Sequence, residues 1–435
     1  MNYTEQSKSS SLRMFMFFVC ILTLNLIASS VSFAVEGLVN PKKETKEITV
    51  GGPDADIPGF TTRSIQIAMD ALDLKGGGTV RLGPGRYEID APVKLYNNIN
   101  FIGSGSSTVL HKIDAFRTNF VIDADYGMFK ATVKDASGLK PGMGILLYDD
   151  VHNDCWDHTT ARITSVEGNV IYFDSKLVRD YYAAANGTIT TSGSIIEGNG
   201  VENVRIENLV VDGNKSNNDI ISGCIGGGVY LYRARNVIVE NVTVRNFNGD
   251  SFSWQTTENI TVRKCEAEYG TGLGFHPGTG SDTTCIEDCR SHHNEADGIF
   301  LCWRVQNGTF RNNVIYNNGR FGISIGHKDT DNIFENNHIY ENAQHGVNFR
   351  DETEENGGHR NTFRKNIIEN NGSTEFKAYG FYIGGVTYDL TIDGNIIRST
   401  GKGNQVGAVF IGENALRIVE NNNTISGHPA VTKQK

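Results

Sequence analysis

The chain has 435 residues, including 49 glycines and only 8 prolines, and its formal net charge is −10 at pH 7. Such an acidic chain argues against a nucleic-acid partner, because contacts to phosphates need an excess of basic side chains. Abundant glycine with frequent asparagine is typical of many tight turns between short strands.

Residues 1–34 have the pattern of a signal peptide. Lys8 and Arg13 precede an apolar run over residues 14–28, and small side chains up to Ala34 offer a cleavage site. The run is shorter than the roughly 20 residues that a membrane-spanning helix needs. We therefore predict a secreted or periplasmic protein that has no membrane partner after cleavage and acts as a monomer.

Residues 48–113 predict a helical cap followed by the first coils of a repeat. In the segment 59–74, Thr61 or Thr62 can cap a helix. Its apolar side chains fall on one face, at Ile65, Ala68, Met69 and Leu72. The open end of a stack of repeats has to be covered, and we assign this role to the helix.

Residues 114–193 lack the period of the later repeats. Residues 135–148 and 163–173 instead have the pattern of hairpin strands separated by turns. We expect a small β subdomain that stands beside the repeats and forms one wall of a cleft.

The segment 149–158 within this subdomain is dense in acids and imidazoles and contains Trp156. Two interpretations are open: a site for a divalent ion, Ca²⁺ or Zn²⁺, or a hydrophilic lip whose Trp156 contacts a glycan. No recognised ligand spacing is present, which favours the lip. The sequence requires no cofactor, and Ca²⁺ is the candidate that it leaves open.

Residues 194–428 carry an internal repeat, and residues 429–435 are a tail. Corresponding positions are Cys265, Cys289, Asn313 and Asn337, a constant step of 24 residues. A fixed period in this range, combined with strand alternation, predicts a coiled parallel sheet whose turns stack.

One interior column of this repeat holds amides and thiols. The amides are expected to hydrogen-bond from coil to coil as a ladder of Asn313, Asn337, Asn366 and Asn395. Cys265 and Cys289 fall in the same column on adjacent coils, either bridged or stacked as free thiols.

The entry into the repeat has a recognisable pattern. Residues 76–82 read Gly-Gly-Gly-Thr-Val-Arg-Leu, and Pro84-Gly85-Arg86-Tyr87 follows. On these residues the chain resembles the pectate-lyase-like superfamily, in which a helical cap, a Gly-Gly-Thr-Val strand and a Pro-Gly-x-Tyr turn open the solenoid. The resemblance covers residues 50–110 and 201 onward. It implies an all-β fold: a right-handed parallel β-helix with an N-terminal helical cap and a small β insert.

One face of the repeat is expected to bind a polysaccharide. In the Gly-led strand of each coil, alternation turns the residues between the apolar ones toward solvent. Five coils at about 4.8 Å each give a strip of about 20 Å, the scale of a few sugar units. The substrate-binding candidates on this strip and in the turns after it are Trp254, Gln255, Phe300, Trp303, Asn348 and Tyr382. The alternative is a solvated face with chance aromatics.

The same strip gathers side chains suited to acid–base chemistry. The catalytic candidates are His276, His327, Lys328, Arg304, Arg350, Asp351, Glu352 and Asp297. His276 is the first choice for a general base or acid, because imidazole titrates near neutrality; a structural histidine is the alternative. The two arginines can hold a uronate carboxylate. Residues 351–355 also have the pattern of a solvated acidic loop.

Motifs of the superfamily match only in part. Gly326-His327-Lys328 shares two residues with the Gly-His-Gly of polygalacturonases, whose other motifs are absent from the strip. The Asp-Pro-His-Asp of mannuronan epimerases is missing, and His276-Pro277 has the inverted order. No catalytic residue is carried over from the family.

The chemistry is therefore predicted from residue types. β-Elimination of a uronate needs positive charge at the carboxylate, a base for the C5 proton and an acid at the leaving oxygen. Hydrolysis needs two carboxylates about 5 to 9.5 Å apart, which Asp297 with Asp351 or Glu352 could supply. We predict an exported polysaccharide-degrading enzyme, with a polysaccharide lyase favoured over a glycoside hydrolase or uronate epimerase. A non-catalytic glycan-binding or cell-surface β-helix protein is the alternative.

Overall fold

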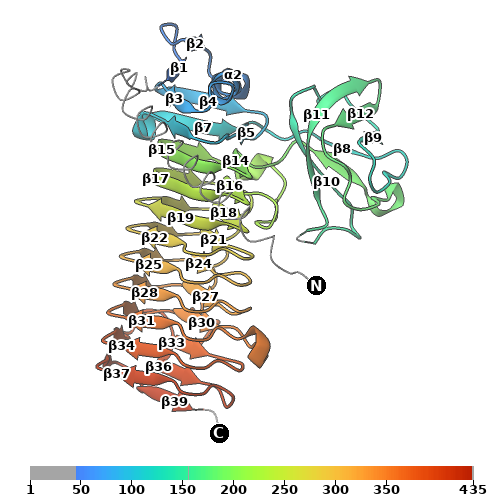
Figure 1. The fold of residues 1–435 in the computed structure, drawn as a ribbon. Helices are drawn as coiled ribbons and strands as arrows, with labels where there is room; N and C mark the ends of the chain where they lie inside the picture. Colours follow the sequence, from blue (N-terminus) through green and yellow to red (C-terminus); the bar gives the residue numbers. More distant parts are fainter. Residues whose placement is uncertain (1–45, 155, 434–435) are drawn as a thin grey trace, which may run out of the picture. The chain divides into compact units, whose positions relative to one another are not determined.

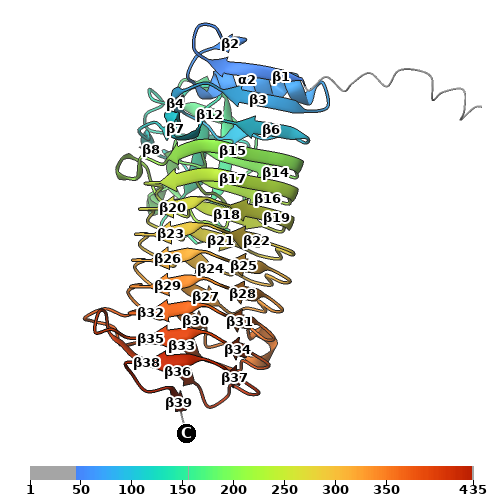
Figure 2. The same ribbon diagram turned by 90° about the vertical axis from the view of Figure 1, so that its left-hand side faces the viewer.

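The computed structural model describes residues 46–154 and 156–433, so the predicted signal peptide lies outside the described residues. Each coil places its strands in parallel register with those of the next coil, which produces three columns of strands along the stack (Figure 1, Figure 2). The predicted parallel β-helix is thus confirmed. Within the described residues, none of the helices has the length and apolar character needed to span a bilayer.

Two of the columns share the long strands β15 (Glu202–Asp212) and β17 (Arg235–Arg245). Figure 2 shows these two columns side by side. The first column also contains β1 (Glu47–Gly51), β3 (Gly78–Leu82), β6 (Ile99–Ile102), β19 (Glu258–Arg263), β22 (Cys285–Glu287), β25 (Thr309–Arg311), β28 (Ile333–Glu335), β31 (Thr362–Arg364), β34 (Thr391–Asp393) and β37 (Val419–Asn421). The second contains β4 (Gly85–Ile89), β7 (Thr108–Lys112), β20 (Glu266–Glu268), β23 (Arg290–His292), β26 (Val314–Tyr316), β29 (His338–Tyr340), β32 (Ile367–Glu369), β35 (Ile396–Arg398) and β38 (Thr424–Ser426).

The third column carries the face that the sequence analysis singles out. Its strands are β5 (Val93–Lys94), β14 (Ile196–Asn199), β16 (Val229–Tyr232), β18 (Phe252–Gln255), β21 (Phe275–Pro277), β24 (Ile299–Phe300), β27 (Ile323–Ile325), β30 (Val347–Phe349), β33 (Ala378–Ile383), β36 (Gln405–Ile411) and β39 (Val431–Lys433). The inward side chains of its central coils are fully buried, as expected from their alternation: Phe275, Ile299, Ile323, Val347 and Phe381.

The amide ladder is confirmed. Asn313 Nδ2 donates to Asn337 Oδ1 at 2.9 Å, and the same bond joins Asn337 to Asn366 and Asn366 to Asn395 at 2.9 Å. Cys289 continues this column, because its backbone N–H donates to Asn313 Oδ1 at 3.0 Å. Cys265 and Cys289 are free thiols stacked in the interior and are not bridged.

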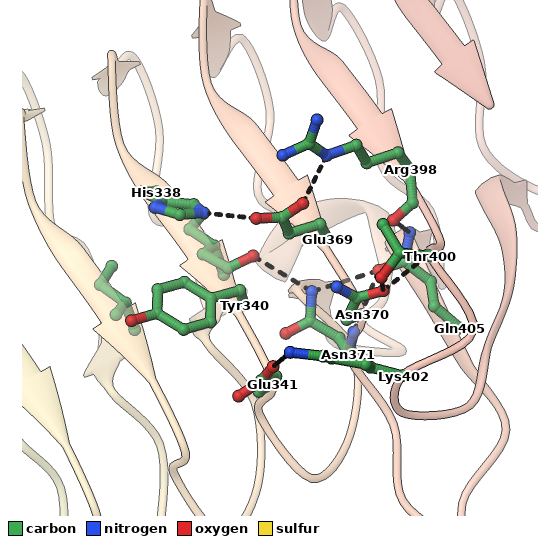
Figure 3. A network of polar contacts seen from close by, with 12 residues as sticks. His338, Tyr340, Glu341, Glu369, Asn370, Asn371, Arg398, Thr400, Lys402 and Gln405 are labelled. Atoms are coloured by element: carbon green, nitrogen blue, oxygen red, sulfur yellow. Dashed lines mark hydrogen bonds and ion pairs between the residues drawn. The ribbon is translucent and has the colours of Figure 1, made fainter. Parts of the chain in front are cut away.

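A second ladder runs through another corner of the coils, which the sequence analysis missed. It passes through Asn294, Asn318, Asn342 and Asn371 and ends on Gln405. Figure 3 shows its end, with Asn371 near Gln405, beside an ion-pair network in which Glu369 binds His338 and Arg398. Both ladders satisfy buried polar groups at the bends and hold successive coils in register.

Helix α2 (Thr62–Asp73) forms the predicted cap. Thr61 is its N-cap, and the side chain of Thr61 accepts a hydrogen bond from the backbone N–H of Ser64 at 3.2 Å. The predicted apolar face is buried and packs against β1 and β3, while β2 (Ile57–Pro58) pairs with β1.

A separate sheet lies in sequence between β7 and β14. Its antiparallel strands are β8 (Arg117–Asn119), β9 (Lys130–Thr132), β10 (Gly144–Tyr148), β11 (Thr159–Glu167), β12 (Val170–Phe173) and β13 (Thr188–Thr190). They enclose a small core of their own, which includes Phe120, Leu147, Ile171 and Ile189. We call this segment the insert sheet.

Candidate functional site

The alternation in β18 is opposite to the one expected from the sequence. Phe252 and Trp254 pair with Phe275 and Pro277 and lie in the core, where Trp254 is 2% exposed. Gln255 lies on the other side of the strand but is fully buried. The segment at Gly223 covers it, and the Gln255 amide donates to the carbonyl of Gly223 at 3.3 Å. The prediction that Trp254 and Gln255 face solvent is therefore wrong.

Strand pairing defines the outward positions along the third column of strands. Strand pairing places Lys94, Glu197, Tyr230, Ser253 and His276 at equivalent positions of successive coils. The pairing of β21 with β24 continues this column to Phe300, and β27, β30 and β33 extend it to Ser324, Asn348 and Tyr382. His276 is therefore at the position equivalent to Phe300 in the next coil.

Five of the candidate residues meet in the turns that follow β24, β27 and β30. We call Phe300, Trp303, His327, Arg350 and Glu352 the turn cluster. The rings of Trp303 and His327 are 4.9 Å apart, and His327 Nε2 lies 2.7 Å from Glu352 Oε1. The guanidinium carbon of Arg350 lies 4.5 Å from the centre of the Phe300 ring, and Arg350 Nε lies 3.8 Å from Glu352 Oε1. Three consecutive coils thus bring an aromatic surface, an imidazole, a carboxylate and a cation together.

Backbone conformation at the turns sets this geometry. Trp303, Arg304, His327 and Lys328 all have left-handed φ angles, between 46° and 67°. Such angles are uncommon for residues with a Cβ, and they turn the chain sharply after the strand. Trp303 is 44% exposed in these turns, and Arg304, Lys328 and Asp351 are exposed as well.

Environment moves the pKa values of the His327–Glu352 pair in opposite directions. Burial and the positive charge of Arg350 lower the pKa of His327, so its imidazole is neutral at pH 7. Burial raises the pKa of Glu352, although Arg350 opposes this effect and Asp351 adds to it. Nδ1 of His327 is covered and has no hydrogen-bond partner among the described residues.

Arg350 is held from below by Asp329, which the sequence analysis missed. Arg350 Nη2 donates to Asp329 Oδ2 at 3.2 Å and to the carbonyl of Leu301 at 2.9 Å, while Nη1 donates to Ser324 at 3.1 Å. Asp329 is fully buried, and burial raises its pKa to about 6 against the charge of Arg350. An aspartate directly after His327 and Lys328 gives no sequence signal of this role.

His276 belongs to a different, buried pair. Its Nδ1 lies 2.7 Å from Asp250 Oδ2, and the residue is 4% exposed, so the prediction that it projects into solvent is wrong. Burial alone would lower the pKa of His276, but the hydrogen bond to Asp250 and the nearby Cys302 raise it to about 9. Asp250 is also missed by sequence reasoning; its Oδ1 accepts the backbone N–H of Leu273 at 2.8 Å.

Two further candidates are buried. Asp297 is fully buried, accepts the backbone N–H of Phe321 at 3.1 Å and lies 3.5 Å from Arg320. Burial raises the pKa of Asp297 to about 6. It is therefore not the exposed carboxylate that the sequence analysis expected to face Asp351 or Glu352. Asn348 is 7% exposed, again contrary to expectation.

The remaining aromatic candidate, Tyr382, lies further along the face. It is partly exposed and stacks on Phe410 at 4.8 Å and on His345 at 4.7 Å between ring centres. Phe300 is partly exposed as well. The exposed part of the face thus consists of aromatic rings with the cations and carboxylates of the turns.

Cys155 lies outside the described residues. Among the other residues of the segment 149–158, no group of side chains has metal-ligand spacing. Asp149 is fully buried, and its oxygens accept the backbone N–H groups of Val151, His152 and Tyr182. Trp156 of the same segment is 46% exposed. Among the described residues, the group with metal-ligand spacing is instead Glu266, Glu268 and His292, on the second column.

The fold and site define a right-handed parallel β-helix with a polar, aromatic face built on one of its three columns. Residues 194–363 match the model of the right-handed β-helix region. Residues 51–276 match that of the rhamnogalacturonase A/epimerase, pectate lyase-like family, and the chain belongs to this family.

Comparison with individual proteins gives distant relatives. The mannuronan C5-epimerase AlgE6 of Azotobacter vinelandii is 25% identical over 264 residues, 60% of this chain and 21% of that protein. Alginate lyase 7 of the same organism is 23% identical over 272 residues, 61% of this chain and 21% of that protein. The chain therefore spans about a fifth of the length of these relatives.

Solved structures share the fold. The A-module of the A. vinelandii epimerase AlgE4 has a TM-score of 0.55 at 18% identity, covering 86% of this chain and 96% of that module. The Streptococcus pneumoniae surface protein and adhesin PfbA has a TM-score of 0.51 at 13% identity, covering 86% and 95%. At such identities the likeness concerns the fold alone.

Proposed function

We propose that the chain is a carbohydrate-active enzyme that removes the C5 proton of a uronate residue in an acidic polysaccharide. The observation that carries this proposal is the turn cluster, where the His327–Glu352 pair contacts the exposed Trp303 and the exposed cations Arg304 and Lys328 belong to the same turns. The relatives named mannuronan C5-epimerase and alginate lyase support the choice of a uronate substrate.

Arg304 and Lys328 can neutralise the uronate carboxylate, which is the first requirement for removing the C5 proton. The C5 proton is acidic only when the charge of the neighbouring carboxylate is neutralised as the proton leaves. Arg304 and Lys328 are exposed on consecutive turns, and the guanidinium carbon of Arg304 lies 5.7 Å from the centre of the Trp303 ring. In this proposal they bind the carboxylate, while the sugar ring stacks on Trp303.

The His327–Glu352 pair answers the second requirement. A neutral imidazole can accept the C5 proton at Nδ1 while Nε2–H donates to Glu352, whose negative charge stabilises the imidazolium. Nδ1 is covered in the free chain, so substrate access requires a neighbour such as Trp303 to move. Catalytic contacts are often incomplete before substrate binds.

Two products can follow from the same first step. If the bond from C4 to the leaving oxygen breaks and that oxygen is protonated, the electrons form a C4–C5 double bond and the reaction is that of a lyase. If C5 instead takes a proton on its opposite face, the reaction is that of an epimerase. We favour these two over hydrolysis, because the carboxylate Asp297 is buried.

A matched pair of histidine variants tests the proposal. His338 on β29 also pairs with a glutamate, at 2.8 Å from Glu369, but lies on the second column (Figure 3). We expect His327→Gln to lower kcat by about 10²- to 10⁴-fold and His338→Gln to leave it unchanged. Turnover is measured on a panel of polyuronates, by ultraviolet absorbance of unsaturated ends and by NMR of C5 configuration.

The outcomes separate the functional classes. Equal activity of the two variants would remove His327 from the mechanism. Binding of a polyuronate without either product would instead favour a non-catalytic glycan-binding protein, a class to which the similar fold of the adhesin PfbA lends support.

A further inference from the structure

A cavity lies between the first coils of the third column and the insert sheet, away from the turn cluster. Its volume is about 460 Å³, within the range of small-molecule sites. Lys94 of β5 and Glu197 of β14 line it on one side, and Gly144 and Arg162 of β10 and β11 line it on the other.

An unsatisfied cation lines this cavity. Lys112, at the end of β7, is 2% exposed, and its ammonium nitrogen has no hydrogen-bond partner among the described residues. Burial lowers the pKa of Lys112 to about 8, although the charge of Asp90 opposes this. A buried ammonium group without an acceptor is unfavourable, and an anionic ligand would supply the missing acceptor.

Two more cations, Lys94 and Arg162, line the cavity. Arg162 is held in place, since its guanidinium donates to the carbonyls of Gly142 and Pro92 at 3.2 and 2.9 Å. The acids of the wall are Asp73, Asp174 and Glu197. Asp174 accepts the backbone N–H of Arg162 at 2.8 Å, and burial raises the pKa of Glu197 against the charges of Lys94 and Arg162.

Hydroxyl groups and small apolar patches complete the lining. The hydroxyl-bearing side chains are Tyr96, Thr160, Ser175, Thr191, Ser192 and Ser194. Hydroxyls with a few apolar surfaces match a sugar ring, and a buried cation matches a carboxylate. We propose that this cavity binds a carboxylate-bearing sugar residue, as a second site for the acidic polysaccharide.

The position of the cavity connects it to the turn cluster. Lys94 and Glu197 begin the outward column that continues through Tyr230, Ser253 and His276 to Phe300. Five strand spacings of about 4.8 Å separate Lys94 from Phe300, a span of about 24 Å that a few sugar residues cover. Tyr230, Ser253 and His276 between them are buried, so a glycan that reaches both sites would pass over the segment at Gly223 that covers Ser253. The choice of ligand rests on the proposed function, whereas the site itself rests on the cavity and on Lys112.

The test compares chain lengths in a background that does not turn over substrate. Binding of oligomannuronate and oligogalacturonate, as tetrasaccharide and octasaccharide, is measured by calorimetry to full-length His327→Gln protein. We expect the octasaccharide to bind at least tenfold more tightly, because it reaches both sites. Adding Lys112→Met should abolish this advantage and leave tetrasaccharide binding at the turn cluster intact.

Two further variants keep the test decisive. Lys134→Met removes an exposed lysine of the insert sheet and should change nothing. Gly193→Leu fills the cavity from a position where a Cβ meets no atom within 4 Å, and should act like Lys112→Met if the latter does not fold. A chain-length advantage that survives both cavity variants would overturn the proposal. If the wild-type chain turns over no polyuronate but the cavity variants still lose the chain-length advantage, the proposed function fails and the cavity site stands.

Discussion

At the scale of single residues, two of the three tryptophans, Trp254 and Trp303, have different roles. Trp254 is buried, and its indole N–H donates to Thr284 at 3.2 Å, whereas Trp303 is exposed beside His327. We expect Trp254→Phe to lower the unfolding free energy by about 1–3 kcal/mol, through a cavity and a lost hydrogen bond, without changing substrate affinity. Trp303→Ala should leave stability within about 0.5 kcal/mol and weaken substrate binding about tenfold. Urea unfolding and calorimetry distinguish the two effects, and a destabilised Trp303→Ala would contradict the assignment.

The buried pair of Asp250 and His276 predicts a pH dependence of stability. Because the pKa of His276 is raised to about 9, the folded chain binds this proton more tightly than the unfolded chain. The stabilisation is complete below about pH 6.5 and is lost as pH rises through about 9, by an amount on the order of 3 kcal/mol. Unfolding measured from pH 6 to 10 should show this fall in the wild type and a flatter profile in His276→Gln. Parallel profiles would mean that the pair does not hold the proton.

At the scale of elements, the amide ladder fixes the register on which the site depends. Asn337→Ala leaves the amide of Asn313 without its acceptor and removes the bond to Asn366. We expect a loss of about 2–4 kcal/mol in unfolding free energy, since buried donors lose their partners. Thr374→Ala, at an exposed position, should cost less than about 0.5 kcal/mol. Similar values for both variants would show that the ladder contributes no net stability.

The elements themselves could be predicted where one pattern decides them. The cap helix, the ladder and the inward column follow from periodicity, because burial selects the same residue type in every coil. The prediction for β18 is wrong for a physical reason. Ser253 and Gln255 face outward but are buried under the segment at Gly223, so the polar side chains of this strand are not the exposed ones. Asp250 hydrogen-bonds to His276, and Asp329 hydrogen-bonds to Arg350. Both contacts join different coils, and such contacts leave no signal in the spacing of residues along the sequence.

At the scale of the molecule, the stacked coils work as a scaffold on which neighbouring turns share one surface. Each coil contacts mainly its neighbours, so the turn cluster depends on the coils from β24 to β30 and not on a single loop. The register of these coils brings together Trp303, His327 and Glu352, which are far apart in sequence. This explains why residues of the turn cluster could be named as candidates from the sequence while their geometry could not be predicted.

Proton removal from C5 is tested most directly by hydrogen exchange. The protein is incubated with polyuronates in D₂O, and NMR of the recovered polymer and of any unsaturated product measures deuterium at C5 and loss of the C5 proton. We predict that the wild type either places deuterium at C5 or forms an unsaturated product, and that His327→Gln does neither above about one per cent of that rate. A polymer that binds to the wild type yet keeps all of its C5 protons would contradict the proposed reaction.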